Sequence, residues 1–256
     1  IAAIIEQIEI GLATLDPTIE IQRVGLSTPG PATLDGVLLK TPNLDPRLWD
    51  QFSIRGELEA EIRKQHPKIS VDYIGDGQAA ALGEYCVRTH RIRWERVAGR
   101  PTDESQLSSL FMVTVGTGLG GGEVRDGQPV RGSLGRAGHA GHIFLPPYAF
   151  RYEHDQQLLV GNAMCTLESA VSLTALAHQL GYRLKLDAWR DHSLNAVEIS
   201  LRDKAKQLRE LAAINDPLAL ELFYDQARAL GIGLLSANYL GDYDLLVIGG
   251  GVCDLA

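Results

Sequence analysis

The residue types with the clearest chemical potential are Thr117 and the five glycines around it, in the range 116–122. Glycines let backbone N–H groups come close to phosphate oxygens, because no Cβ keeps the two apart. Three of these glycines also satisfy the dinucleotide-binding pattern G-x-G-x-x-G, but that pattern needs a helix to begin at its last glycine. The tight-turn pair Asp126–Gly127 follows too soon for such a helix. The stretch therefore predicts a strand–turn–strand hairpin that contacts a terminal phosphate, in preference to a tight turn with no ligand.

A single carboxylate, Asp76, follows the predicted strand 69–74 and lies between Gly75 and Gly77. An aspartate in this position can accept a proton from a substrate hydroxyl while that oxygen attacks phosphorus. The same position also suits an N-cap for the helix that follows, and many isolated aspartates at such junctions are caps. Taken alone, Asp76 leaves both interpretations open.

Two histidines, His139 and His142, lie three residues apart among glycines. They fit half of a metal site, a sugar-contacting loop, or a pair of ordinary loop histidines. A structural zinc site generally needs four nitrogen or sulfur ligands, and Cys165 is the only cysteine near them in sequence. Glu168 begins a predicted helix, where the helix dipole favours a carboxylate without any ligand.

These residues need a scaffold, and the pattern along the chain predicts an α/β architecture of alternating strands and helices. The polar stretch 87–108 separates a smaller N-terminal lobe, 1–108, from a larger C-terminal lobe, 109–256. In the first lobe the predicted elements are helices over 1–12, 54–62 and 79–85 and strands over 21–27, 36–39 and 69–74. In the second lobe, outside the hairpin, they are helices over 166–179, ending near Gly181, and 217–239, and a strand over 245–248 that runs into Gly249–Gly251.

Composition excludes several classes of function. The 256 residues are 45% hydrophobic and 22% charged, which is enough for a substantial core in one or two domains. The net charge of −8, without a dense basic run, argues against a nucleic-acid partner. No apolar run approaches the roughly 20 residues that cross a membrane. Three widely spaced cysteines without a CxxC pair predict reduced thiols and a cytoplasmic protein.

The order of the motifs resembles the ROK family of sugar kinases and sugar-responsive repressors, in the actin–hexokinase–Hsp70 superfamily, and the resemblance is glucokinase-like. It spans nearly the whole chain. The matching segments are Gly25–Pro31, Thr41–Leu44 with Trp49, Gly75–Asp76 before Ala80–Glu84, Val115–Gly122, Ala137–His142, Leu167–Glu168 and Val247–Gly251.

This resemblance implies a two-lobed, actin-like ATPase (ribonuclease H-like) fold with ATP and a sugar in the cleft between the lobes. It implies that Asp76 is the catalytic base and that Mg²⁺ accompanies the ATP phosphates. It assigns ATP contacts to Gly116, Thr117, Gly118, Gly250 and Gly251, and sugar contacts to Asn43, His139, His142 and Glu168. Family members are commonly oligomers, so a homodimer is expected.

The chain departs from the family pattern at several positions. Family kinases usually have Asn where this chain has Gly75 and Glu where it has His139. The family's zinc loop is not intact, because Thr166 occupies its last cysteine position, and zinc is therefore not expected. The first phosphate loop, Asp-x-Gly-Gly-Thr, would lie before Ile1. Because the sequence also stops abruptly at Ala256, the chain is expected to be clipped at both ends.

Two functions follow as hypotheses. The first is ATP-dependent phosphorylation of a sugar or sugar-like hydroxyl, for which a base at Asp76 and a hydroxyl at Thr117 are needed. The second is a non-catalytic sugar-binding regulator or pseudokinase. The changes at Gly75 and His139 favour this second function or a kinase with an unusual substrate. A nicotinamide-dependent oxidoreductase is disfavoured because the glycines lie in a predicted hairpin.

Overall fold

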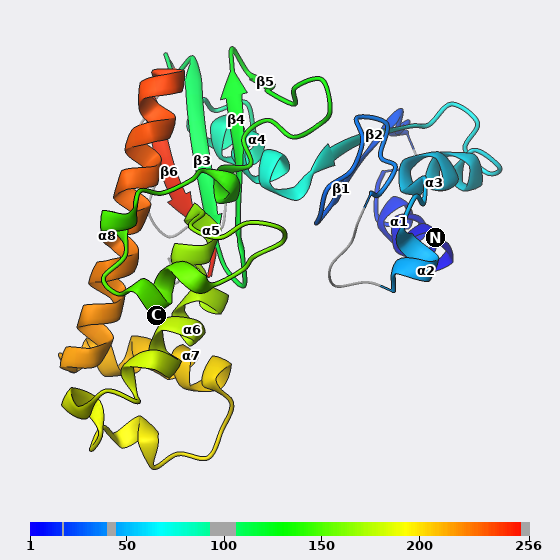
Figure 1. Ribbon diagram of the computed structural model, residues 1–256. Coiled ribbons are helices and arrows are strands. Elements are labelled where there is room, and N and C mark those ends of the chain that lie inside the picture. Colours follow the sequence, from blue (N-terminus) through cyan, green and yellow to red (C-terminus); the bar gives the residue numbers. More distant parts are fainter. Residues whose placement is uncertain (17, 40–44, 93–105, 252–256) are drawn as a thin grey trace.

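The computed structural model describes residues 1–16, 18–39, 45–92 and 106–251. Figure 1 shows a smaller group of elements around β1 and β2 and a larger group around β3, β4 and β6, with α4 leading from one to the other. In chain order the helices and strands are α1 (Ala2–Ala13), β1 (Arg23–Thr28), α2 (Pro46–Trp49), α3 (Ile54–Ile62), β2 (Ser70–Gly75), α4 (Asp76–Arg88), β3 (Ser109–Val115), β4 (Leu119–Arg125), β5 (Gln128–Pro129), α5 (Leu167–Ala170), α6 (Leu173–Arg183), α7 (Leu201–Ala213), α8 (Pro217–Gly241) and β6 (Leu245–Gly249). Short 3₁₀ helices cover Ala140–His142, Pro147–Ala149, Glu153–Gln157, Asp187–Trp189 and Ser193–Asn195.

The smaller group is built on the parallel pair β1–β2, whose register runs from Arg23 opposite Ser70 to Thr28 opposite Gly75. Helix α3 buries Ile54, Leu58 and Ile62, which are spaced four residues apart and so lie on one face. Helix α1 adds further isoleucines to the same apolar cluster. The two parallel strands end side by side, which places Gly75 and the start of α4 at one edge of this sheet.

The larger group contains a sheet with strand order β5-β4-β3-β6. Strands β3 and β4 form an antiparallel hairpin, and β6 pairs with β3 in parallel. Successive residues of β3 point to opposite faces. Phe111, Val113 and Val115 pack in a core with residues of α5 and α8, while Leu110 packs with Ala81 and Tyr85 of α4. Helix α4 therefore covers one face of the sheet and α8 the other (Figure 1).

The structure confirms the predicted glycine hairpin, the helices at 1–12, 54–62 and 217–239, and strands close to 21–27, 69–74 and 245–248. The predicted strand 36–39 is wrong, because only isolated bridges, Ala32 with Leu38 and Val37 with Ser53, occur there. The predicted helix 79–85 is the middle of α4, which already begins at Asp76.

The predicted helix 166–179 is also wrong as a single element. It divides into α5 and α6 at Ser172, whose side chain accepts the N–H of Ala175 and caps the second helix. Gly181 does not end α6 but makes room for α7, because a Cβ there would lie 2.8 Å from Cδ1 of Leu201. Within the described parts of the chain, no helix has both the length and the apolar character that crossing a bilayer requires.

Candidate functional site

The turn at the tip of the β3–β4 hairpin, Gly116–Gly118, is held from one side by the start of α6. The N–H of Leu173 donates to the carbonyl of Gly116 at 2.9 Å, and Oγ1 of Thr174 donates to the carbonyl of Thr117 at 2.8 Å. In a trans peptide the following N–H points opposite to the carbonyl. The N–H groups of Thr117 and Gly118 therefore both point away from α6, and successive N–H groups of this kind form an anion-binding concavity.

The abundance of glycine in this segment has a second cause besides phosphate contact. A Cβ at Gly121 would lie 2.7 Å from the carbonyl oxygen of Gly138, and one at Gly122 would lie 2.6 Å from that of Gly77. Strand β4 thus needs glycines at these positions, because side chains there would keep α4 and the loop around Gly138 from approaching it. A Cβ at Gly116, by contrast, would meet nothing within 4 Å. Packing rather than a ligand therefore explains Gly121 and Gly122.

Asp76 is the first residue of α4, and Gly75 takes the N-cap position. The Asp76 side chain is exposed, and its Oδ1 accepts the N–H of Gly77 at 2.7 Å. Within the described residues Oδ2 has no hydrogen-bond partner, so it is available to accept a proton from a ligand. Asp76 is thus not the cap that the sequence left as an alternative.

The loop that carries His139 is tied to α4 by Gln78, whose side chain is 2% exposed. Its Nε2 donates to the carbonyl of Ala137 at 3.0 Å and to those of Val130 and Gly135 at 3.4 Å. This bond network holds the loop at the same end of α4 as Asp76, two residues away on the helix. Because these backbone carbonyls already accept hydrogen bonds from Gln78, the histidine side chains are the groups of the loop that can bind a ligand.

His139 is half-buried, and its ring lies nearly parallel to that of His142, with 6.2 Å between the ring centroids. Burial lowers the pKa of His139, and His142 lowers it further. The negative charge of Asp76 opposes this shift in pKa, which shows that the two side chains interact electrostatically. A histidine with a lowered pKa is neutral at pH 7 and offers one donor and one acceptor.

Glu168 lies on α5, whose start is fixed by a reciprocal cap between Thr166 and Ser169. Its carboxylate reaches the glycine turn, because a Cβ at Gly118 would lie 2.6 Å from Oε1 of Glu168. Burial raises the pKa of Glu168, while His142 and the N–H of Leu119 oppose that rise. Glu168 therefore lies between the glycine turn and the histidine loop and interacts with both.

The other two glycines assigned to ATP lie at the end of β6. Gly250 has a φ of +93°, and a Cβ there would collide with the backbone of Val115, the last residue of β3. The end of β6 is thus adjacent to the glycine turn. A guanidinium N–H of Arg209 donates to the carbonyl of Gly251. Asn43 lies outside the described residues.

The described site residues form a continuous row rather than scattered points. Gly250 adjoins the glycine turn, the turn adjoins Glu168, and Glu168 interacts with His142. His142 stacks on His139, and His139 interacts with Asp76. The row thus connects a group of backbone donors suited to an anion with a carboxylate that has an open oxygen.

Comparison with known proteins places this arrangement in a family. A profile of the ROK family matches residues 2–256. The chain belongs to the ROK family. A glucokinase of Aeropyrum pernix is 28% identical over 238 residues, which cover 91% of this chain and 65% of that protein. A putative xylose repressor of a Caldicellulosiruptor species is 27% identical over 227 residues, 88% of this chain and 49% of that protein.

Solved structures agree. The crystal structure of a ROK family glucokinase from Streptomyces griseus, in complex with glucose and AMPPNP, superposes with a TM-score of 0.68 at 25% identity. The match covers 99% of this chain and 73% of the glucokinase. The chain thus has the α/β, actin-like ATPase fold of the ROK kinases. It spans less than two thirds of the length of the curated relatives that it matches, as the 65% coverage of the Aeropyrum protein illustrates.

Gly75 and His139, where the ROK resemblance leads us to expect Asn and Glu, line one small crevice of about 10 Å³ next to Asp76. Gly75 and His139 share it with Tyr73 and Arg131. The hydroxyl of Tyr73 is hydrogen-bonded to that of Thr28 at 2.7 Å, and burial raises the pKa of Tyr73. Replacing two polar family side chains at one point therefore changes a single patch of the site rather than two separate ones.

Thr166, where the resemblance leads us to expect the last cysteine of a zinc loop, accepts the N–H of Ser169 at 3.2 Å and is the N-cap of α5. The described residues hold no group of three or more His, Cys, Asp and Glu side chains that could bind a metal ion. Sequence reasoning missed Gln78, which fixes the histidine loop, and Arg202, which contacts the glycine turn. Neither residue belongs to a recognisable motif, and both act through contacts that only the folded chain creates.

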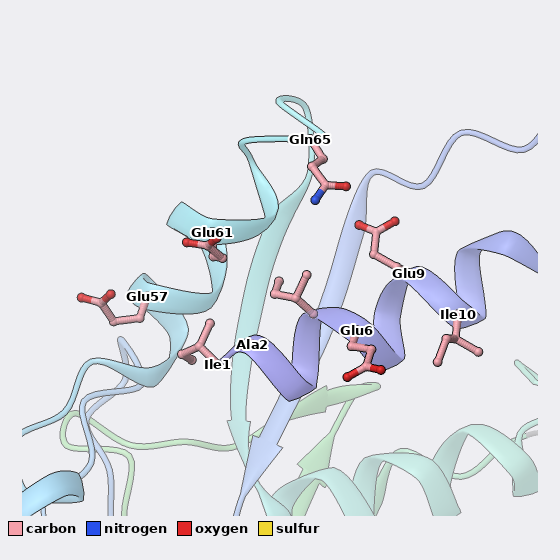
Figure 2. A pocket seen from close by; sticks show the side chains of 9 residues that line it. Ile1, Ala2, Glu6, Glu9, Ile10, Glu57, Glu61 and Gln65 are labelled. Carbon is pink, nitrogen blue, oxygen red and sulfur yellow. The ribbon is translucent and has the colours of Figure 1, made fainter.

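A second hollow, of about 740 Å³, lies between α1 and α3 (Figure 2). It is lined by apolar side chains of α1 and by carboxylates from both helices, among them Glu6, Glu9, Glu57 and Glu61. Clustered carboxylates repel anions. This groove therefore does not compete with the glycine turn as a phosphate site.

Proposed function

We propose that the protein is an ATP-dependent kinase that phosphorylates a hydroxyl group of a sugar or sugar-like compound. The observation that carries this proposal is the position of Asp76. Its Oδ2 has no described partner, and it stands at one end of the row that leads through His139, His142 and Glu168 to the glycine turn. A kinase needs both a proton acceptor and a phosphate cradle along such a row.

In this proposal each end of the row has its own task. His139, His142 and Glu168 hold the hydroxyl groups of the sugar, and Oδ2 of Asp76 accepts the proton of the attacking hydroxyl. The N–H groups of Thr117 and Gly118 hold phosphate oxygens of ATP, and Gly250 and Gly251 lie on the adenosine side. Magnesium, when bound with ATP, neutralises charge on the transferred phosphoryl group.

A non-catalytic sugar-binding regulator is the second candidate. The clustering of Gly75 and His139 in one crevice favours it, because both replace side chains that ROK kinases usually place near the sugar. The similarity to a putative xylose repressor points in the same direction. A regulator binds sugar but needs no proton acceptor, so loss of Asp76 would cost it nothing.

The deciding experiment measures ADP release by the full-length gene product with Mg-ATP and a panel of hexoses, N-acetylhexosamines and polyols. Asp76→Asn is expected to keep ATP binding and to lower turnover by at least about 100-fold, because general-base catalysis contributes about 10²–10⁴. Asp72→Asn is the matched control. Asp72 is exposed on β2, and its ion-pair partner among the described residues is the exposed Arg23 at 3.5 Å.

The outcomes separate the two candidates. Turnover that depends on one compound and is lost only in Asp76→Asn establishes the kinase and identifies its class of substrate. Binding of a sugar without turnover, in wild type and in both variants, favours the regulator. Equal turnover in wild type and Asp76→Asn removes Asp76 as the base.

A further inference from the structure

A basic side chain from α7 reaches the glycine turn. Nη2 of Arg202 donates to Oγ1 of Thr117 at 2.8 Å. The Arg202 side chain is exposed, and a guanidinium has five N–H donors in a planar fork. The bond to Thr117 uses one of them, and within the described residues the remaining donors are available beside the N–H groups of the turn.

The same face of α7 also reaches the end of β6. Arg209 follows Arg202 by seven residues, which is two helical turns, so the two side chains project from one face. Arg209 donates to the carbonyl of Gly251. Seven residues correspond to about 10.5 Å of helix rise. One face of α7 therefore runs from the glycine turn, Gly116–Gly118, to the glycines at the end of β6, Gly249–Gly251.

The start of α7 is anchored by packing. Gly181 of α6 lets Leu201 come close, and Ala205 and Leu208 are buried on the face of α7 next to that of Arg202 and Arg209. Since α6 also holds the carbonyls of the glycine turn through Leu173 and Thr174, the turn and α7 share one support. The contact between Arg202 and Thr117 thus joins two segments that are each fixed to α6.

The carboxylate next to Arg202 in sequence has other hydrogen-bond partners, although its charge also interacts with Arg202. The adjacent acid, Asp203, already accepts from Ser200 at 2.6 Å and from Lys206 at 2.8 Å. Arg202 is exposed to solvent, so a ligand can reach its guanidinium. A guanidinium matches two oxygens of a phosphate group at once, which a single ammonium does not.

We propose that Arg202 is a nucleotide-binding residue that donates hydrogen bonds to the phosphate chain of ATP held at the glycine turn. This inference rests on the proposed kinase function and adds a side-chain cation to a cradle that otherwise consists of backbone N–H groups and one hydroxyl. Arg209, at the other end of the same face, fixes α7 to the adenosine-side segment.

The test is calorimetric titration of the full-length protein with Mg-ATP and, separately, with adenosine, which has no phosphate. Arg202→Gln is expected to weaken ATP binding by about 10- to 100-fold, the usual effect of hydrogen bonds to a charged group. Adenosine binding and the thermal midpoint stay at wild-type values. Arg202→Lys recovers part of the loss. Lys204→Gln, which removes the same charge from the same helix and leaves the Lys206–Asp203 ion pair in place, keeps wild-type affinity.

A second comparison separates direct contact from support of Thr117. If Arg202 only orients the Thr117 hydroxyl, then Thr117→Ala and the double variant Thr117→Ala/Arg202→Gln bind ATP equally. Direct contact predicts weaker binding by the double variant. Wild-type ATP affinity in Arg202→Gln overturns the inference and leaves the kinase proposal standing if turnover persists. A wild-type protein that binds no ATP overturns both.

Discussion

In the proposed kinase, His139 changes the hydrogen bonds that the site can offer to a sugar. Because burial lowers its pKa, the imidazole is neutral near pH 7 and presents one donor and one acceptor. A glutamate, usual at this position in family kinases, only accepts, and its charge strengthens bonds from sugar hydroxyls. Charges of both signs act on His139: the negative charge of Asp76 raises its pKa, and the positive charge of Arg136 lowers it.

We expect His139→Glu to tighten binding of common hexoses by about tenfold, because charge-assisted hydrogen bonds are worth about 1.5–3 kcal/mol and part of this is offset by repulsion from Asp76. Calorimetric titration with glucose and mannose measures the change. His139→Gln, which has the same length without the charge, is the control. Unchanged hexose affinity in His139→Glu would show that this loop does not face the sugar.

The lowered pKa of His139 also predicts a pH dependence of stability. Below its ordinary value of 6.5 the unfolded chain binds a proton at this residue before the native chain does. The free energy of unfolding therefore falls as pH drops through this window, by at most about 1.4 kcal/mol per pH unit. His139→Gln removes this contribution, so its stability should fall less steeply.

Urea unfolding of both proteins at pH 7.5, 6.5 and 5.5 measures that difference in slope. His154, whose pKa is also lowered by burial, is present in both proteins and cancels in the comparison. Parallel slopes for wild type and His139→Gln would mean that His139 titrates at its ordinary pKa.

At the scale of elements, the approach of α4 to β4 sets the position of Asp76. Gly77 lies against Gly121, and Gly122 lies against Gly77 and Gln78, so three glycines remove the side chains that would separate helix and strand. The first turn of α4, which carries Asp76, is therefore placed by backbone contacts rather than by interlocking side chains. A backbone contact leaves little room for adjustment.

Gly122→Ala is expected to destabilise the protein by about 1–3 kcal/mol, because the new Cβ would lie 2.6 Å from the carbonyl oxygen of Gly77 and overpack the contact. Gly83→Ala, in the middle of α4, is the matched control. A Cβ at Gly83 meets nothing within 4 Å. Alanine there should raise the free energy of unfolding by about 0.5–1 kcal/mol, because alanine has the higher helix propensity. Urea unfolding gives both values, and two effects of the same sign would contradict this account.

For the whole molecule, sequence patterns predicted elements whose local signals were strong. Helix α3 shows apolar residues four apart, and the hairpin shows an apolar run followed by glycines and Asp126–Gly127. Helix α7 was missed because nearly half of its residues are charged and only Ala205 and Leu208 are buried. The single helix predicted over 166–179 failed because the role of Ser172 as a cap depends on where the chain turns.

The candidate site was predicted in part for a related reason. Motif order selected Asp76, His139 and Glu168 as candidates, since each lies in a recognisable segment, and their roles stay predictions. Gln78 and Arg202 escaped, because their partners are 59 and 85 residues away in sequence. The division at residue 108 and the homodimer stay predictions, and sedimentation analysis of the full-length protein measures the second.

The glycines of strand β4 bear on which residues a family member keeps when it loses catalysis. Gly77, Gly121, Gly122 and Gly138 lie in close backbone contacts that stabilise the fold, whether or not the chain transfers phosphate. A lineage that abandoned turnover would be selected to keep them. Asp76, Thr117 and Arg202 are exposed, so in such a lineage they would be the first to drift. We therefore expect active and inactive members to share these glycines and to differ at the exposed side chains beside them.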